Sequence, residues 1–343
     1  MANELSAEQV ALLSGKQIPP QLVAHLMGLD VASIHVDRPL TNMVVGYKNR
    51  AYVADAIMPV VPVAKRSDKY FEFDPAENLT ILQTTLAGTR GMPNEVSSHV
   101  SAPHSYLVND HALLYFVSAD ELMNADAPLR PMEIANRRLW NSLMIAREQR
   151  VSTALTTSGN YGAQTTALVG GDRWDQSTSD PVAQLFAAIK SCLVRPTHLV
   201  INEEVETYLM NHAKVLQFLL GRAASKAGPT ELYPNEDMLA KLLGLEGLIV
   251  SRAKYNSAVE GHTMTQAYLW GKSAALIRVE PSPSISETAV TSYTLRFGAI
   301  ETRIIPEYLH GVRGGSFVKM SHSDAETIIG APYTSFLFTT VVS

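Results

Sequence analysis

The sequence predicts an α+β protein, and three of its segments indicate this fold class. Residues 132–157 form one long helical pattern, residues 180–280 alternate between short helices and short strands, and residues 292–343 are rich in strand-forming residues. Helices and strands that gather in different parts of a chain are typical of this class. The remaining segments contain too few apolar residues for a core of their own, so we expect them to lie against other parts or other chains.

The composition argues against several functional classes. The 343 residues carry 28 Lys and Arg against 33 Asp and Glu, so the net charge of −5 lacks the basic excess of a free nucleic-acid-binding protein. An apolar content of 46% is far above that of disordered chains. Charged residues make up only 18% of the chain, a low value that an ordinary soluble surface and a surface partly buried against other subunits can both have.

The sequence predicts a soluble protein made and used in a cytoplasm, with no membrane partner. Cys192 is the single cysteine, so no intrachain disulfide can form. The first residues, MANELSAEQV, lack the basic-then-apolar order of a secretory signal. The most apolar stretches, residues 111–119 and 335–342, are much shorter than the roughly 18 residues that span a bilayer.

Residues 1–38 are predicted to form an arm of two short helices. Ser6 and Gln9 have the spacing of a capping box, and a second amphipathic helix is expected from Pro20 to Leu29. Neither helix can bury much surface alone, so the arm must lie on its own body or on a neighbour. A loosely docked terminus and a partner-binding segment are both open at this point.

Two extended segments follow the arm. The run from Ala56 to Val63 is interrupted by Pro59 and Pro62, which favours an edge strand or an extended crossing over a central strand. Residues 64–105 predict a long hairpin, because strand-like sequences lie on both sides of a Gly- and Pro-rich break. A long exposed hairpin needs a partner to cover it, so this segment is the first indication of assembly.

The longest helix is predicted from Met132 to Thr157, about 26 residues and roughly 39 Å of rod. Its apolar stripe comprises Met132, Ala135, Leu139, Leu143 and Ala146, widened by Trp140, Met144, Val151 and Leu155. Its charged residues are Arg137, Arg138, Arg147, Glu148 and Arg150. The arginines could face anionic neighbours, and a solvated face is the default expectation for them.

Residues 180–280 are predicted to form an α/β or α+β lobe. Asp180-Pro181 starts a helix, Asn202 caps a second helix directly after a strand, and Gly244 ends a third. Leu248–Val250 and Ala274–Ile277 are predicted strands. The tail adds strands at Tyr293–Phe297, Thr302–Ile305, Phe317–Met320 and Phe336–Val342.

No catalytic, cofactor-binding or metal-binding constellation rises above chance. The dinucleotide fingerprint, the phosphate-binding loop, the nucleophile elbow and the zinc-protease motif are all absent, and Gly271-Lys272-Ser273 lacks the upstream glycine of a phosphate loop. His99, His104 and His111 are the densest histidine group. We interpret them as surface histidines, because their spacing gives no converging ligand set. The sequence therefore predicts no enzyme and no cofactor.

Other chemistry-bearing residues also favour structural roles. Glu203, Glu204 and Glu206 open a helix, where carboxylates complement the helix dipole. Cys192 ends an amphipathic helix and is expected to be a small buried residue. The basic pairs Lys65-Arg66 and Arg137-Arg138 are too short for a nucleic-acid-binding surface.

The order of these parts resembles the major capsid proteins of tailed bacteriophages, which have the Hong-Kong-97-type fold. Four segments carry the resemblance across roughly residues 40–280. They are Asn42–Asp74 (NMVVGYKNRAYVADAIMPVVPVAKRSDKYFEFD), Val117–Trp140 leading to Arg147-Glu148, the run from Arg195-Pro196 through His212 and Leu239–Val250 to SRAKYN, and Trp270-Gly271-Lys272. No single motif is specific, but their order is.

The resemblance implies a division of the chain. It comprises an N-terminal arm at 1–45, a peripheral domain from 46–63 and 106–179 with a spine helix at 131–157, an extended loop at 64–105, an axial domain at 180–285, and a strand-rich tail at 286–343 that completes the peripheral domain. Some relatives join subunits through a Lys and an Asn. Lys65, Lys69 and Asn94 lie in or beside the hairpin, but nothing singles them out, so we assign no cross-link.

The resemblance also implies a function. The chain would be a structural protein that self-assembles into hexamers and pentamers. These would form an icosahedral shell around double-stranded DNA, which is packaged without specific contacts. The shell would be assembled in the host bacterial cytoplasm with scaffolding, portal and decoration proteins, and it would become part of the virion. The short arm indicates a separate scaffold or one already removed.

Two alternatives remain open. The same fold forms encapsulin-like compartments that hold an enzyme, and a cargo-binding arm would distinguish them. An enzyme of unrecognised type would need a pocket with converging perturbed groups, which the sequence does not offer.

Overall fold

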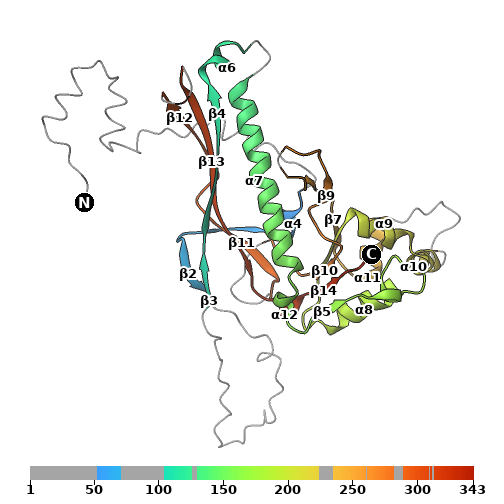
Figure 1. Cartoon of the computed structure of the whole chain (residues 1–343). Coiled ribbons are helices and arrows are strands. Elements are labelled where there is room, and N and C mark those ends of the chain that lie inside the picture. The colour runs from blue at the N-terminus through green and yellow to red at the C-terminus, as the bar shows by residue number, and fades with distance from the viewer. Residues whose placement is uncertain are drawn as a thin grey trace, which may run out of the picture. The chain divides into compact units, whose positions relative to one another are not determined.

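The structure is a computed structural model that describes residues 52–70, 104–125, 130–223, 235–259, 261–281, 289–308, 310 and 313–343 (Figure 1). The predicted arm and the Gly88–Pro93 break of the hairpin lie outside the described residues. The chain divides into two compact units. Among the described residues, unit 1 consists of residues 112–125, 130–140, 300–308, 310 and 313–321, and unit 2 consists of residues 52–70, 104–111, 141–223, 235–259, 261–281, 289–299 and 322–343.

Unit 2 contains a five-stranded mixed sheet in the order β5-β14-β10-β6-β7. These strands are β5 (Thr165–Ala167), β14 (Phe336–Thr339), β10 (Ala274–Ile277), β6 (His198–Asn202) and β7 (Gly247–Ser251). β6 and β7 are parallel, as are β14 and β5, while β10 is antiparallel to both of its neighbours.

Four helices of unit 2 share a hydrophobic core with one face of this sheet. They are α8 (Pro181–Ser191), α9 (Glu203–Asn211), α10 (Ala213–Ala223) and α11 (Glu236–Leu243). Asp180 caps α8, Asn202 caps α9, and Gly244 ends α11 with a left-handed φ of 69°, as the sequence predicts.

The sheet is buried on both faces because its strands alternate between two cores. Along β10, Leu276 packs into the core that contains α8 to α11. Its neighbour Ala275 packs into a second core with Leu155 and Ile57. Successive side chains of a strand point to opposite faces, so a strand covered on both sides is apolar throughout. The sheet is therefore the middle layer of unit 2.

A second sheet is built around β13 (Gly315–Ile328). In unit 2, β1 (Val60–Val63) is parallel to β11 (Ser292–Phe297), which pairs antiparallel with residues 324–328 of β13. In unit 1, β12 (Glu301–Glu307) pairs antiparallel with residues 315–321 of β13. β4 (Asn109–Ser118) also pairs with β13. β4, β13 and the long helix α7 (Pro131–Thr156) each continue from one unit into the other.

The remaining elements are short. β2 (Ser67–Tyr70) and β3 (His104–Leu107) form the antiparallel base of the predicted hairpin, and β8 (Lys254–Asn256) pairs with β9 (Gln266–Tyr268). The short helices are α6 (Ala119–Met123), α12 (Ala331–Thr334) and the 3-10 turns η2 (Ser158–Tyr161) and η3 (Gly170–Asp172).

The prediction of an extended run from Ala56 was wrong at its start. Residues 54–57 form the helix α4 (Ala54–Ile57), and the strand begins only at Val60. No side chain at the N-cap stabilises α4. Instead, the carboxylate of Glu148 accepts hydrogen bonds from the main-chain N–H groups of Val53 and Ala54. The cap thus comes from a distant part of the chain, and no local pattern shows it.

Candidate functional site

Two charged residues of α7 are buried in unit 2, so the default expectation of a solvated face was wrong for Arg147, which lies against anionic neighbours instead. The side chain of Arg147 is 3% exposed, and Glu148 is fully buried. Both residues lie three or four positions from Met144 and Val151, which are also buried. Residues at this spacing share one face of a helix. The spacing, rather than the residue type, was the signal that could have placed them inside.

Glu148 connects three elements of unit 2. Its carboxylate accepts hydrogen bonds from Val53 N at 3.2 Å, Ala54 N at 2.9 Å and Trp270 Nε1 at 2.7 Å. Burial raises the pKa of Glu148, and these hydrogen bonds to the charged form oppose that rise. The carboxylate therefore attaches α7 to the start of α4 and to the segment that precedes β10.

Arg147 enters a cluster of charges on β11 and β13. Its Nη1 donates to Asp55 Oδ1 at 2.5 Å, and its Nε lies 3.7 Å from Asp324 Oδ2. Arg296 holds the same Asp324 through two hydrogen bonds of 2.7 and 2.8 Å. Burial alone would raise the pKa of Asp324, but hydrogen bonding and charge from Arg296 lower it below its usual value. Asp324 is therefore ionised inside the protein.

His322 completes this cluster. Its side chain is fully buried, its Nε2 lies 3.6 Å from Asp324 Oδ2, and its ring packs against His111 at 5.3 Å between centroids. Burial lowers the pKa of His322 to about 4, so the ring is neutral at neutral pH. We call the set Asp55, Arg147, Glu148, Trp270, Arg296, His322 and Asp324 the spine charge network. The contacts of this network fix the positions of α7, α4, β11 and β13, so we assign the network a structural role.

A second group of charges lies on the surface of unit 2. Arg252 pairs with Glu206 at 3.2 Å and with Glu236 at 2.7 Å, and Tyr268 donates to Glu203 at 2.8 Å. Burial and the neighbouring Glu236 raise the pKa of Glu206 to about 7. Glu203, Glu204 and Glu206 do open α9, as predicted, but the fold also brings them cationic partners that are distant in the sequence.

The other residues considered in the sequence have structural contacts. His104 stacks on Tyr70 with centroids 5.7 Å apart, while His99 and Asn94 lie outside the described residues. Within the residues that the structure describes, no three His, Cys, Asp or Glu side chains form a group that could hold a metal ion. Cys192 is buried, which raises its pKa to about 11. The predicted small apolar role of Cys192 agrees with this burial.

The basic pairs also have structural partners. Arg66 pairs with Asp110 at 2.6 Å, and the guanidinium of Arg138 lies over the ring of Tyr115 at 5.6 Å from its centroid. Lys65 also pairs with Asp68 at 3.1 Å, so both members of the first pair and Arg138 of the second have partners within the chain.

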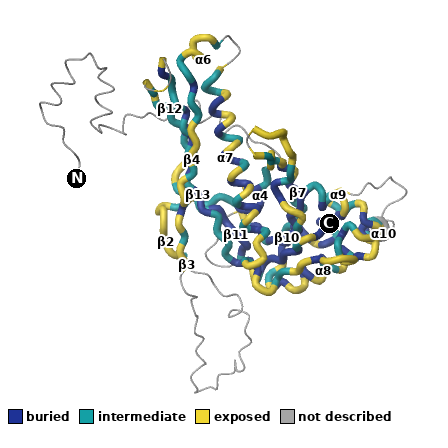
Figure 2. Tube along the Cα trace, in the orientation of Figure 1, coloured by how far each residue is buried: buried dark blue, intermediate teal, exposed yellow. Residues whose placement is uncertain are grey.

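Unit 1 exposes many large apolar side chains. We call the set Leu113, Leu114, Leu122, Met123, Ile134 and Tyr308 the unit 1 apolar residues. Leu114 is 57% exposed and Met123 is 66% exposed. Figure 2 shows α6 as an exposed element in unit 1. Six further large apolar side chains are exposed in unit 2, but unit 1 is the smaller unit, so its exposed apolar side chains are denser and favour contact with another protein surface.

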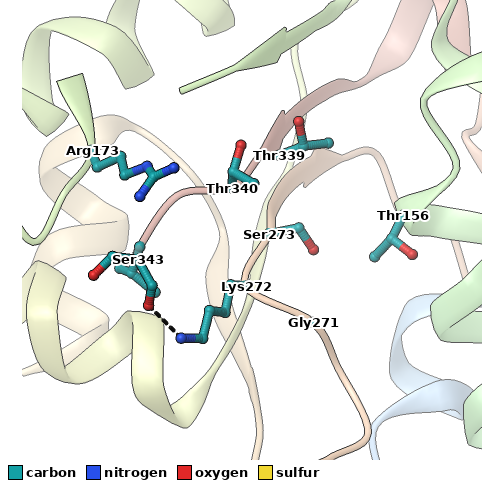
Figure 3. Close-up of a pocket in the computed structure, with 9 residues that line it drawn as sticks. Thr156, Arg173, Gly271, Lys272, Ser273, Thr339, Thr340 and Ser343 are labelled. Atoms are coloured by element: carbon teal, nitrogen blue, oxygen red, sulfur yellow. Dashed lines mark hydrogen bonds between the residues drawn. The ribbon is translucent and has the colours of Figure 1, made fainter. Parts of the chain in front are cut away.

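Unit 2 also has a pocket of about 390 Å³ (Figure 3). It is lined by Thr156, Arg173, Gly271, Lys272, Ser273, Thr339, Thr340, Val342 and Ser343. The Nζ of Lys272 donates a hydrogen bond to the main-chain oxygen of Ser343. In the sequence, Lys272 stands in the incomplete phosphate-loop pattern and in the Trp270-Gly271-Lys272 segment of the capsid resemblance, and neither pattern includes Arg173.

Comparison with known proteins gives relatives along nearly the whole chain. No family model matches the sequence. The major capsid protein of Pseudomonas phage JBD67 is 28% identical over 313 residues, which cover 91% of this chain and 99% of that protein. The major capsid protein of Burkholderia phage BcepMu is 24% identical over 249 residues, which cover 71% of this chain and 76% of that protein.

Solved structures share the fold. A phage-related protein from Bordetella bronchiseptica RB50 matches with a TM-score of 0.66 and 19% identity over 90% of this chain and 98% of its own. The capsid of the cyanophage P-SCSP1u matches with a TM-score of 0.55 and 14% identity over 98% of both chains. Among the helices in the described ranges, none combines the length and apolar character needed to cross a bilayer. The described elements and these neighbours therefore agree on one architecture.

Proposed function

Because this chain is a phage major capsid protein with the Hong-Kong-97-type fold, we propose that its copies assemble into the hexamers and pentamers of an icosahedral shell. The observation that carries this proposal is the match with the major capsid protein of Pseudomonas phage JBD67. It covers 91% of this chain and 99% of that protein, so neither chain has a large additional segment that could serve a different role. The shell would enclose double-stranded DNA without base-specific contacts, which is compatible with a net charge of −5.

The surface of unit 1 supports assembly. Its exposed apolar residues lose contact with water only if another surface covers them, and burial of apolar area is the main favourable term in most associations. Stable interfaces bury about 1,600 Å² in total, and we expect each subunit to bury well above that value across its several neighbours.

We also propose the roles of the chain segments and the partners. Residues 1–45 would lie on neighbouring subunits, residues 64–105 would clasp an adjacent capsomer, and residues 180–285 would pack around the five- and six-fold centres. Scaffolding, portal and decoration proteins would act during assembly in the host cytoplasm and in the finished virion.

Substitution of the unit 1 apolar residues tests the proposal. Electron microscopy of the purified protein should show closed particles, and the double variant Leu114→Ser with Met123→Ser should reduce the particle fraction strongly. Val259 is 74% exposed but lies in unit 2, so Val259→Ser is the matched control and should assemble normally. Particles from phage lysates that hold a protein cargo and no DNA would instead support the compartment alternative.

A further inference from the structure

The pocket of unit 2 contains a cation without a counter-ion. The Nε of Arg173 is buried and has no hydrogen-bond partner, and its guanidinium forms no ion pair within the described part of the chain. In Figure 3 the side chain of Arg173 is directed toward Thr340 across the pocket. The side chain of Arg173 as a whole is half-buried, but its Nε–H is shielded from water and has no acceptor, so the isolated subunit leaves this hydrogen bond unmade.

The other charged groups at the pocket are already engaged. The Nζ of Lys272 lies 3.3 Å from Glu204 Oε1 and also donates to the main-chain oxygen of Ser343. Asp175 Oδ2 accepts hydrogen bonds from the N–H and the hydroxyl of Ser343. Ser343 is therefore fixed between Lys272 and Asp175. Of the two cations that line the pocket, only Arg173 has no partner among the described residues.

The pocket has room for a side chain from outside. Its volume is about 390 Å³, and no atom lies within 4 Å of the position that a Cβ would take at Gly271. The hydroxyls of Thr156 and Thr340 donate to Ser152 O and Leu168 O. Each of these hydroxyls retains lone pairs but has used its proton. The hydroxyls of Ser273 and Thr339 have no partner among the described residues and can also donate, but Arg173 is the lining residue that brings an unpaired positive charge.

We propose that this pocket receives the carboxylate of an acidic side chain from a second copy of this chain, held by the guanidinium of Arg173. The proposal rests on the self-assembly proposed above. Each copy carries 33 carboxylate side chains against 28 Lys and Arg, so an excess of acidic groups is available on a neighbour. A guanidinium matches a carboxylate with two parallel hydrogen bonds, which gives both affinity and orientation.

A cross-linking experiment tests which group enters the pocket. Particles are assembled from a mixture of unlabelled and ¹⁵N-labelled Arg173→Lys protein and treated with a carbodiimide. The carbodiimide takes up one carboxylate oxygen and leaves as a urea, while the introduced amine forms an amide with the carbonyl carbon. We expect peptides that join position 173 to an Asp or Glu, with both labels in one cross-link. These should be found in particles and not in unassembled subunits.

If none of the cross-links at position 173 joins a labelled to an unlabelled peptide, or if no cross-link forms there, the proposal is overturned. The wild-type protein is treated in parallel, because any cross-link through Lys272 must appear in both samples. If the wild-type chain forms no particles at all, the proposed function fails instead, so the two failures are distinguishable.

The strength of the contact is measured by assembly. Arg173→Gln should raise the protein concentration at half-assembly about tenfold, and it should leave the unfolding midpoint of the unassembled subunit unchanged. Lys190 is an exposed cation of the same unit, so Lys190→Gln removes the same charge and should change neither quantity. Normal assembly of Arg173→Gln, or a lowered unfolding midpoint that indicates a role within the subunit, would contradict the proposal.

Discussion

Glu148 is the residue on which three parts of unit 2 depend. It is fully buried, and its two carboxylate oxygens accept hydrogen bonds from two main-chain N–H groups and one indole N–H. If this side chain is removed, these donors lose their partner in the protein interior. An unsatisfied buried donor costs about 1–3 kcal/mol, which exceeds the net value of an ordinary hydrogen bond.

We expect Glu148→Ala to lower the free energy of unfolding by about 3 kcal/mol or more, because three donors lose one acceptor. Chemical denaturation of the unassembled subunit measures this change. Glu133 lies on the same helix and pairs with Arg130 at the surface, so Glu133→Ala should cost less than about 1 kcal/mol. Equal effects of the two substitutions would show that the buried hydrogen bonds do not hold α7.

His322 should make the stability of the subunit depend on pH. Asp324, Arg296, Arg150 and His111 surround it, and burial lowers its pKa from 6.5 to about 4. The unfolded chain therefore binds the proton more readily than the folded chain does. The contribution of neutral His322 is complete above pH 6.5 and is lost as the pH falls toward 4.

The size of this effect follows from about 1.4 kcal/mol for each unit of pKa. Between pH 7 and pH 4.5, the wild-type subunit should lose about 2–3 kcal/mol more stability than His322→Leu, which cannot titrate at this position. Urea denaturation at both pH values tests this difference. Parallel pH profiles for the two proteins would mean that His322 is already solvated or protonated in the folded state.

At the scale of elements, Asn202 links a helix start to a loop. Its Oδ1 accepts from Val205 N at 2.7 Å, and its Nδ2 donates to the carbonyl oxygen of Trp270 at 3.1 Å. Asn202→Ala should cost about 2 kcal/mol, because it removes a cap and leaves a buried carbonyl without its donor. Asp180→Ala removes only the more exposed cap of α8 and should cost about 1 kcal/mol. If thermal unfolding shows that Asp180→Ala lowers the unfolding midpoint as much as Asn202→Ala or more, the proposed double role of Asn202 is wrong.

Elements with local signals could be predicted, and those with distant partners could not. Asp180, Asn202 and Gly244 marked helix ends in the sequence, and the structure has those ends. Ser118 and Glu121 form a capping box that starts α6, and their spacing is a local signal of this helix start in the sequence. In contrast, α4 takes its cap from Glu148, which is 94 residues from Ala54.

The same reason limits prediction of the pocket. Arg173 and Lys272 lie 99 residues apart in the sequence, and Lys272 and Ser343 lie 71 apart, so only the fold brings the three to one pocket. Arg147 and Glu148 differ from these residues, because the helical spacing of α7 already placed them on its buried side. For Arg147, charge taken alone gave the opposite and incorrect expectation.

At the scale of the whole molecule, the hairpin should serve assembly rather than folding. Residues 71–103 lie between β2 and β3, and Tyr70 pairs with His104 at the end of that ladder. Replacing residues 71–103 with an Asn-Gly turn should therefore close a short hairpin without strain. We expect this variant to fold with an unchanged unfolding midpoint but to form no closed shell, because a contact between copies is removed.

Sedimentation and circular dichroism measure the two outcomes of this deletion separately. An unfolded body would show that the segment belongs to the core of the subunit. Normal particles would show that it makes no essential contact between copies. The control is the same Asn-Gly turn placed beside residues 71–103 without any deletion, which should still assemble.

The most direct test is cryo-electron microscopy of particles assembled from the purified chain. We expect closed icosahedral shells in which the density of each subunit, with its unit 1 and unit 2, repeats around both five-fold and six-fold centres. A protein that stays monomeric across all concentrations and salt conditions, with its unit 1 apolar residues facing solvent, would contradict it.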